Sequence, residues 1–319
     1  MQNIPVLDHL ALDEIAAGQV ARCWLPITSD ALGNPILLPL IVARGRADGP
    51  VLGITAVVHG NELNGLSVLR GFFAQLDVAA LRGTVVGVPV VNVPGFFRGQ
   101  RVFSDGGDLN KLMPGKANGN DSEAYAHRFM ERVVSQFQYL IDLHTASAGR
   151  INSLYIRADL RHPVVAALAR LQHAQIILNH EGAEGTLRRA ALERGIPSIT
   201  VELGDPALFQ AGMLRAGLVG LKNALIHLEM LDDALEPPAA PPVECERSSW
   251  LYTDAGGILE VLPGLAEEVA SGQEIAVLTN IFGDVLRRYT APEAGIVIGK
   301  SINPVNQTGG RILHLGIRA

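Results

Sequence analysis

The sequence predicts an α/β protein in which helices flank a mostly parallel, mixed sheet, with a small all-β domain at the C-terminal end. Three observations predict this fold. Strand-like and helix-like segments alternate over residues 34–231, several strand-like segments are too apolar to be half exposed, and short strands follow a proline-rich stretch. We therefore expect a large domain over residues 1–235, a linker over 236–242 and a β-domain over 243–319.

Apolar runs and helical spacing define the expected elements of the large domain. In its first helix, Leu66, Leu69 and Phe73 recur at the spacing of a helix that buries one face. The expected strands cover residues 34–45, 49–60, 83–93, 139–144, 175–180 and 197–205. The expected helices cover residues 63–77, 122–137, 162–174, 185–195 and 212–231. Sites in such sheets form at the carboxyl ends of the strands, so polar residues there are functional candidates.

The last part of the chain has a different pattern. The run "EPPAAPP" (236–242) is typical of a stiff, extended linker. Short apolar segments such as "GGILEVL" and "AGIVIGK" follow it, separated by Gly, Pro and Asn. This pattern predicts the all-β domain.

Composition excludes several classes of protein. With 48% hydrophobic residues and 18% charged residues, the chain is globular. The net charge of -6 and the lack of a long basic run argue against nucleic acid or an anionic membrane as partner, although a basic pocket for a small anion stays compatible. No apolar run is long enough to span a bilayer, and the N-terminus lacks a signal-peptide pattern. We interpret Cys23 and Cys245 as free thiols of a cytoplasmic protein.

The stretch "VVHGNELNG" (57–65) places an imidazole and a carboxylate just past an apolar strand. Residues three apart at a helix start share a face, so His59 and Glu62 can converge on one point. Both are zinc ligand types. On its own, this pair is more typical of a polar strand end that opens a helix.

Two further strand ends strengthen the metal hypothesis. His144 ends "YLIDLH", and a catalytic zinc takes three protein ligands and leaves a position for water. Glu202 lies in the apolar strand "TVELGD", where a carboxylate is costly unless it is paired or functional. It can take the proton of a metal-bound water. The alternatives are a hydrogen-bonded strand-end histidine for His144 and, for Glu202, an ion pair with Arg188, Arg189 or Arg194.

The loop "FFRGQRVFSDGGDLNKLMPG" (96–115) is dense in polar groups. Arginine forks match oxyanions, so Arg98 and Arg101 can bind a carboxylate or polarise a carbonyl. Asp108 can orient a ligand histidine, while Asn110 and Lys111 can hold a substrate carboxylate. The alternative is an ordinary solvated loop.

The order of four motifs, "HGNE", "DLNK", "DLHT" and "TVELGD", resembles the succinylglutamate desuccinylase/aspartoacylase family over residues from about 35 to 235. The resemblance implies a zinc carboxypeptidase-like fold and one Zn²⁺ per chain. The C-terminal segments resemble the biotinyl/lipoyl-like barrel of many members. No lysine sits in an attachment hairpin, so we expect no lipoyl or biotin group.

The resemblance also implies a role for each matching residue. The zinc ligands would be His59, Glu62 and His144, and Glu202 would be the general base. Arg101 would polarise the scissile carbonyl, with Arg98 close enough to leave the choice between the two arginines open. Asp108 would orient a ligand histidine and Asn110 would bind the substrate carboxylate.

Lys111 departs from the usual "DLNR" of the family, since lysine keeps the charge but loses the fork. The hypothesis is a zinc-dependent amidohydrolase that removes an acyl group from an N-acyl amino acid or similar small amide, with acetylated diaminobutyrate deacetylases as one comparison. The alternatives are a metallocarboxypeptidase acting on peptides and a non-catalytic zinc-binding homologue. The acyl group, the amine and the oligomeric state stay open, a homo-oligomer included.

Overall fold

A nine-stranded mixed sheet forms the centre of the large domain in the computed structural model, which describes residues 4–318. Its strands are β1 Gln19–Ser29, β2 Pro35–Arg44, β3 Ala47–Ala56, β4 Arg82–Val88, β5 Tyr139–His144, β7 Leu154–Ala158, β8 Ile176–Asn179, β9 Ser198–Leu203 and β10 Val243–Cys245. Their order is β1-β2-β4-β3-β5-β9-β7-β8-β10. The central strands β4, β3, β5 and β9 are parallel, whereas β2 and β7 pair with them antiparallel.

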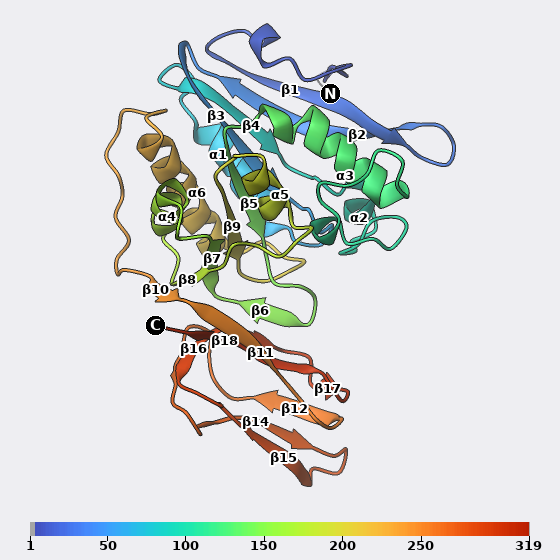
Figure 1. Ribbon diagram of the computed structural model, residues 1–319, viewed down its shortest axis with the longest axis vertical. Coiled ribbons are helices and arrows are strands. Elements are labelled where there is room, and N and C mark those ends of the chain that lie inside the picture. The colour runs from blue at the N-terminus through green and yellow to red at the C-terminus, as the bar shows by residue number, and fades with distance from the viewer. Residues whose placement is uncertain (1–3, 319) are drawn as a thin grey trace.

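Helices cover both faces of this sheet (Figure 1). The α-helices are α1 Asn64–Gln75, α2 Val93–Phe97, α3 Asp121–Arg132, α4 Pro163–Arg170, α5 Leu187–Glu193 and α6 Ala211–His227, and short 3-10 turns are η1 Leu12–Glu14, η2 Leu109–Lys111 and η3 Val134–Gln136. Helices α1, α4 and α6 pack on one face, and α3 and α5 on the other. A capping box between Asn120 and Glu123 satisfies the first amides of α3. The predicted α/β class is confirmed.

The buried runs of the sequence became the central strands, as expected from their composition. Every residue of β4 after Arg82 is buried, as is every residue of β5 after Tyr139. Two strands of the large sheet, β1 and β7, lie in stretches for which the sequence predicted no strand. β1 contains Pro26 and alternates between buried and half-buried residues, as an edge strand does. β7 is a short strand between two polar stretches. The expected strand 83–93 ends at Val88, because Pro89 follows it and has no amide N–H to donate to the ladder. Residues Val93–Phe97 then form α2, with Pro94 in its first turn.

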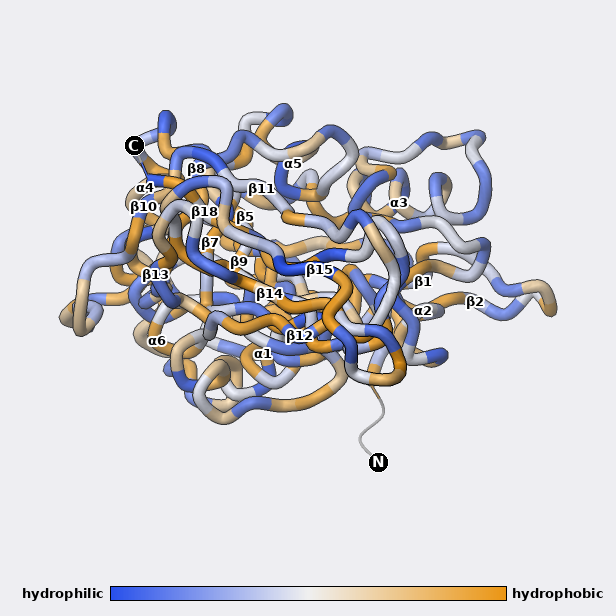
Figure 2. Tube along the Cα trace, turned by 90° about the horizontal axis from the view of Figure 1, so that it is seen from below, coloured by the Kyte–Doolittle hydropathy of each residue, from blue (hydrophilic) through white to orange (hydrophobic). Residues whose placement is uncertain are grey.

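Two antiparallel sheets form the C-terminal part of the described chain. Their strands are β11 Arg247–Tyr252, β12 Gly257–Val261, β13 Glu268–Val269, β14 Glu274–Thr279, β15 Val285–Thr290, β16 Gly295–Ser301, β17 Val305–Asn306 and β18 Arg311–Ile317. One sheet runs β11-β18-β16-β13 and the other β15-β14-β12-β17. In Figure 2, hydrophobic segments follow much of β12 and β14, whose side chains meet the other sheet in one apolar cluster.

Two strands join the large domain to the C-terminal sheets. β10 follows the proline-rich segment but pairs with β8 of the large sheet. In the other direction, β6 (Arg150–Asn152) leaves the large domain and pairs with β16. An apolar cluster that includes Tyr155, Cys245 and Ile298 fills the junction. Cys23 and Cys245 are both buried free thiols. The C-terminal sheets are thus packed against the edge of the large sheet that carries β7 and β8.

No helix within residues 4–318 is long and apolar enough to cross a membrane.

Candidate metal centre

His59 and Glu62 lie in the turn that connects β3 to α1. β3 ends at Ala56, and Val57 takes the left-handed conformation with a φ of 56°, which is rare for a β-branched residue. The amide of Glu62 donates to the carbonyl of His59 at 3.1 Å. Gly60 packs against α2 so closely that a Cβ there would lie 2.1 Å from the carbonyl carbon of Gly95. The pair therefore sits in a constrained turn just before α1, which begins at Asn64 where the sequence predicted a helix over residues 63–77.

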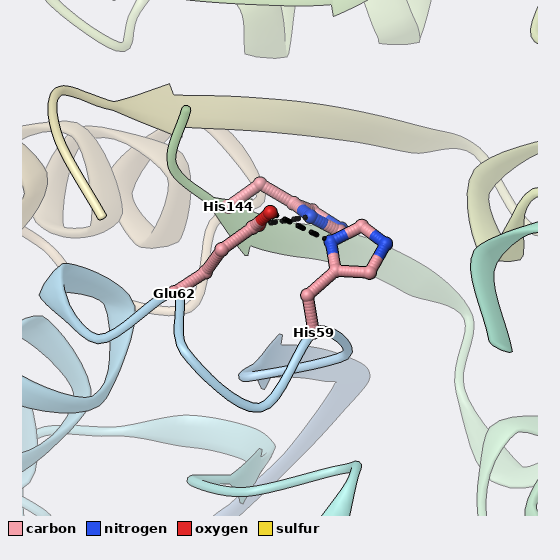
Figure 3. Close-up of side chains that lie close together, drawn as sticks. All are labelled: His59, Glu62 and His144. Atoms are coloured by element: carbon pink, nitrogen blue, oxygen red, sulfur yellow. Dashed lines mark hydrogen bonds and ion pairs between the residues drawn. The ribbon is translucent and has the colours of Figure 1, made fainter. Parts of the chain in front are cut away.

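His144, the last residue of β5, completes a three-residue cluster with this turn (Figure 3). Nδ1 of His144 lies 2.9 Å from Oε2 of Glu62, and Nδ1 of His59 lies 2.9 Å from Oε1 of the same carboxylate. All three side chains are buried. Two segments 82 residues apart in the chain thus aim their ligand atoms at one point.

A carboxylate holds the other ring nitrogen of each histidine. Nε2 of His59 lies 3.0 Å from Oδ1 of Asp108, and Nε2 of His144 lies 2.7 Å from Oδ2 of Asp142. Thr55 Oγ1 donates to the second oxygen of Asp142 at 2.6 Å. This arrangement fixes both rings with Nδ1 directed at Glu62, as is usual for histidines that bind a metal.

The surroundings of the cluster shift the pKa values of Glu62, His144 and Asp108. Burial raises the pKa of Glu62, but the charge of His59 and the hydrogen bond with His144 outweigh it and hold the pKa well below its usual range. Burial lowers the pKa of His144, but Asp142 and Glu62 raise it well above the usual value. Burial raises the pKa of Asp108, yet its hydrogen bond with His59 and the charge of Arg101 lower it overall.

The residues fit a metal ion. The ligand atoms of His59, Glu62 and His144 all lie within 4.8 Å of one another. Nδ1 of His59 is buried and makes no hydrogen bond, although Oε1 of Glu62 is near. A buried nitrogen without a hydrogen bond is costly unless it binds something else. Two imidazole nitrogens and a carboxylate are a donor set that suits zinc.

Arg101 lies beside this cluster and Arg98 does not. Nη1 of Arg101 donates to Oε1 of Glu62 at 2.8 Å and to Oγ of Ser147 at 2.6 Å, and its other nitrogens donate to Oδ2 of Asp108 at 3.2 Å. The guanidinium of Arg98 instead donates to carbonyl oxygens of its own loop. Arg101 is therefore the arginine that faces the cluster.

Glu202 lies near the end of β9, directly beside the cluster. It is paired across the sheet with His144 of β5. Its Oε1 accepts from Nε of Arg157 at 3.2 Å and its Oε2 from Asn152 at 3.4 Å. Tyr155 Oη lies 2.5 Å from Nη2 of Arg157. The expected arginine partners of Glu202 were on α5, whereas the actual partner is on β7.

Asn110 and Lys111 lie on η2 and line the same cavity. Oδ1 of Asn110 accepts from the amide of Leu187 at 2.8 Å, and its NH₂ group has no protein acceptor among residues 4–318. Gly185 has a φ of 81°, and a Cβ there would lie 2.2 Å from the carbonyl of Lys111. The loop before α5 therefore packs directly on η2.

Arg188 of α5 was considered in the sequence only as a partner of Glu202. It is 3% exposed, and its guanidinium donates to the carbonyl of His180 at 2.7 Å. It forms no ion pair with any residue in 4–318. Burial and the charge of Arg157 lower its pKa to about 10. An arginine that is buried at a cavity wall without a carboxylate is suited to a bound anion.

One cavity of about 300 Å³ joins the metal centre to the neighbouring loops, and among the residues described above it is lined by His59, Glu62, Arg101, Asp108, Asn110, Lys111, His144, Arg157, Arg188 and Glu202. Its wall also contains Trp250 and Arg311 from the C-terminal sheets. Asp142 was missed in the sequence although it precedes His144 by two residues, which puts both on one face of the strand. Trp250 and Arg311 reach the cavity only because of how the C-terminal sheets pack, so the sequence around each residue does not predict that it lines the cavity.

Comparisons with known proteins point to one family. A family model described as the succinylglutamate desuccinylase/aspartoacylase catalytic domain matches residues 48–228. A curated relative is the N-alpha-acetyl-L-2,4-diaminobutyric acid deacetylase of Halomonas elongata. It is 27% identical over 266 residues, which are 79% of this chain and 77% of that protein.

Two solved structures share the whole fold. The product-bound ectoine utilization protein EutE (DoeB) from Ruegeria pomeroyi has a TM-score of 0.86 and 23% identity, covering 99% of this chain and 100% of that one. A succinylglutamate desuccinylase from Silicibacter sp. TM1040 has a TM-score of 0.85 and 22% identity, covering 99% of both chains. At these identities the structures show a common fold.

Proposed function

Because the chain belongs to the succinylglutamate desuccinylase/aspartoacylase family, we propose that it is a zinc-dependent deacylase of small N-acyl amino acids. The observation that carries the proposal is the buried cluster of His59, Glu62 and His144, whose ligand atoms lie within 4.8 Å of one another. Both histidines are oriented by carboxylates on their far side. The Halomonas relative is named as a deacetylase and the Silicibacter structure as a desuccinylase. Both names describe removal of an acyl group.

Each residue around the cluster would have a separate role in hydrolysis of the amide. A zinc ion held by the three ligands would acidify a water molecule and polarise the amide carbonyl. Glu202, beside His144, accepts the proton of the attacking water and delivers it to the leaving amine. Arg101 donates hydrogen bonds to the oxyanion that develops on the amide oxygen. In the structure its Nη1 bonds to Glu62 and Ser147, so it already lies at the cluster.

The carboxylate of the substrate would be held at the η2 side of the cavity. Asn110 presents its NH₂ group there, because its oxygen is engaged by Leu187. Lys111 supplies a positive charge from the same turn. The bidentate fork that a lysine lacks would come from Arg188, which is buried and free of any carboxylate within residues 4–318. Arg188 would thus supply the guanidinium that is missing at position 111, where this chain has Lys in place of the family's usual Arg.

The size of the cavity favours a small amide over a peptide. About 300 Å³ is at the low end of the range for ligand pockets. Trp250 and Arg311 of the C-terminal sheets close one side of the cavity, where a peptide would need an open groove. A carboxypeptidase is therefore the weaker proposal. A non-catalytic zinc-binding protein would not need Glu202 and Arg101 beside the ligands.

The test measures zinc stoichiometry and hydrolysis together. Zinc-loaded protein is assayed with a panel of N-acetyl and N-succinyl amino acids and with dipeptides. We expect one zinc per chain, bound by the wild type and not by His144→Ala, and release of the free amino acid from the acylated substrates only. Arg101→Gln should lose activity, while Arg98→Gln, a matched change outside the cavity, should keep it. Hydrolysis of dipeptides alone, or zinc binding with no hydrolysis of the whole panel, would refute the proposal.

A further inference from the structure

The C-terminal sheets expose more apolar side chains than the rest of the chain. More than half of the large apolar side chains that are well exposed within residues 4–318 lie in residues 247–317, which are less than a quarter of the sequence. The sheet β15-β14-β12-β17 and its β14–β15 turn carry most of them. This sheet lies at the end of the molecule away from the nine-stranded sheet (Figure 1), and a view from below has β12, β14 and β15 in front (Figure 2). Its outer face is therefore open to a partner.

Strand pairing places a row of apolar side chains on this outer face. Ile258 of β12 pairs with Thr279 of β14 and with Val305 of β17. Thr279 pairs in turn with Val285 of β15. Directly paired residues of antiparallel strands point to the same face of a sheet. Ile258, Val285 and Val305 are exposed, whereas Leu259, the next residue of β12, is buried in the cluster between the two sheets. The row therefore points away from the other sheet.

The turn between β14 and β15 adds two more apolar side chains at the end of this row. Ile281 is 84% exposed and Phe282 is 88% exposed. Oδ1 of Asn280 accepts from the amides of Phe282 and Asp284, both at 2.9 Å, and Nδ2 of Asn280 donates to Oδ2 of Asp284 at 2.9 Å. These bonds hold the turn in one conformation. A fixed turn that presents two large apolar side chains to solvent, next to an apolar row, is typical of an interaction surface.

The next outward row of the same face carries charges of opposite sign. Val277 of β14 pairs with Glu260 of β12 on one side and with Arg288 of β15 on the other. Glu260 and Arg288 are both exposed. Glu260 has no ion pair within residues 4–318, and Arg288 has one with Glu274 of β14 at 2.7 Å. An acid and a base thus lie at the same height on either side of β14.

This pattern makes the face complementary to itself. A twofold rotation about an axis along β14 places β12 of one copy over β15 of the other. Glu260 of each copy then faces Arg288 of the other copy, and Ile258 faces Val285. The same patch on both subunits is the mark of an isologous interface. The acidic Glu260 on this face disfavours an anionic lipid surface as the partner.

We propose that the outer face of the sheet β15-β14-β12-β17, with Ile281 and Phe282 at its end, is a docking surface for a second copy of this chain. Strands lie about 4.8 Å apart and rise about 3.4 Å per residue, so four strands of up to about six residues present about 400 Å² per copy before the turn is counted. A standard interface buries about 800 Å² per partner. The dimer is therefore weak and reversible. The proposal does not depend on the deacylase function.

Sedimentation velocity of the full chain tests the proposal. The wild type should change from monomer to dimer as its concentration rises, with a dissociation constant of about 1–100 µM. Phe282 is the aromatic anchor, so Phe282→Ser should raise this constant at least about 30-fold. Leu32→Ser should dimerise as the wild type does. It is the matched control, because Leu32 is 87% exposed in the turn between β1 and β2 of the large sheet. A wild type that stays monomeric at about 500 µM, or a Phe282→Ser variant that dimerises as tightly as the wild type, overturns the proposal.

A charge exchange identifies the partner as a second copy in the twofold arrangement. Glu260→Arg alone, or Arg288→Glu alone, brings like charges together twice in a homodimer. Each variant should therefore dimerise at least about tenfold more weakly than the wild type. An equimolar mixture of the two variants restores both pairs of opposite charge, so it should form a heterodimer about as tightly as the wild type dimerises.

Circular dichroism establishes that each charge variant is folded. A mixture that dimerises no better than the separate variants, or separate variants that each dimerise as tightly as the wild type, would refute the twofold contact through this face.

Discussion

Replacing Asp142 by asparagine removes the negative charge behind His144 with almost no change in side-chain size. Oδ2 of Asp142 lies 2.7 Å from Nε2 of His144, and Oδ1 accepts from Thr55 at 2.6 Å. Asp142 has 0% exposure, so no water can take over either contact. The substitution therefore acts on the metal centre through the orientation and basicity of one ligand.

The expected magnitude follows from this geometry. Loss of a partner behind a ligand histidine typically lowers metal affinity 10- to 100-fold, or about 1.4–2.8 kcal/mol. Asp142→Asn should reach the upper end, because both carboxylate oxygens are engaged and buried. Asp108→Asn should cost less. The side chain of Asp108 is 14% exposed, and water can replace part of its contact with His59.

A competition titration with a zinc-binding indicator measures both affinities. The wild type, Asp142→Asn and Asp108→Asn are compared at one pH, with circular dichroism to establish that each is folded. We expect the dissociation constant to rise from the wild type to Asp108→Asn and to rise further in Asp142→Asn. Affinity of Asp142→Asn within twofold of the wild type, or a larger loss in Asp108→Asn, would show that Asp142 does not support a metal ligand.

Three other changes have defined outcomes. Burial lowers the pKa of His314 to about 3, so the stability from its neutral form is complete above pH 6.5 and is lost as the pH falls toward 3. Between pH 8 and pH 5, denaturant titration should show the wild type losing about 2 kcal/mol more than His314→Gln, and equal losses would contradict this. Arg188→Gln should raise KM for N-acyl amino acids about 10- to 100-fold with little change in kcat. The increase in KM should vanish for an N-acyl amine without a carboxylate. An equal increase for both substrates would show that Arg188 does not bind the substrate carboxylate. Gly299→Ala places a Cβ 2.3 Å from Oδ1 of Asn152 and should destabilise the protein by about 1–3 kcal/mol in denaturation. Gly212→Ala is the control, because a Cβ at Gly212 would have no atom within 4 Å. Equal stability of the two variants would show that β6 can move away from a side chain at position 299 at no cost in stability.

Strong hydrophobic patterning made most of the large domain predictable. β4, the second half of β3 and most of β5 are apolar runs in the sequence because they are buried on both faces. β1 was missed since its proline and half-exposed alternation are equally typical of a loop. β10 was expected in the β-domain, and its three residues, Val243–Cys245, carry no signal for which sheet they join. Such pairing is decided by tertiary packing.

The candidate site was partly predictable for a similar reason. His144 and Glu202 end adjacent parallel strands, so their proximity follows from the sheet, and the turn with His59 follows from the neighbouring strand. Asp142 left a readable signal as a charge in an apolar strand. Arg188 and Arg311 left none, because the burial of one and the placement of the other depend on contacts between distant parts of the chain.

The central claim is that the cluster binds zinc and that Glu202 moves the proton in amide hydrolysis. The most direct test is the kcat of zinc-loaded Glu202→Gln relative to the zinc-loaded wild type on an N-acyl amino acid that the wild type hydrolyses. Glutamine keeps the shape of Glu202 but cannot accept a proton. We expect an unchanged zinc stoichiometry and a kcat lower by about 10²- to 10⁴-fold. A variant that keeps more than a tenth of the wild-type kcat would contradict the account.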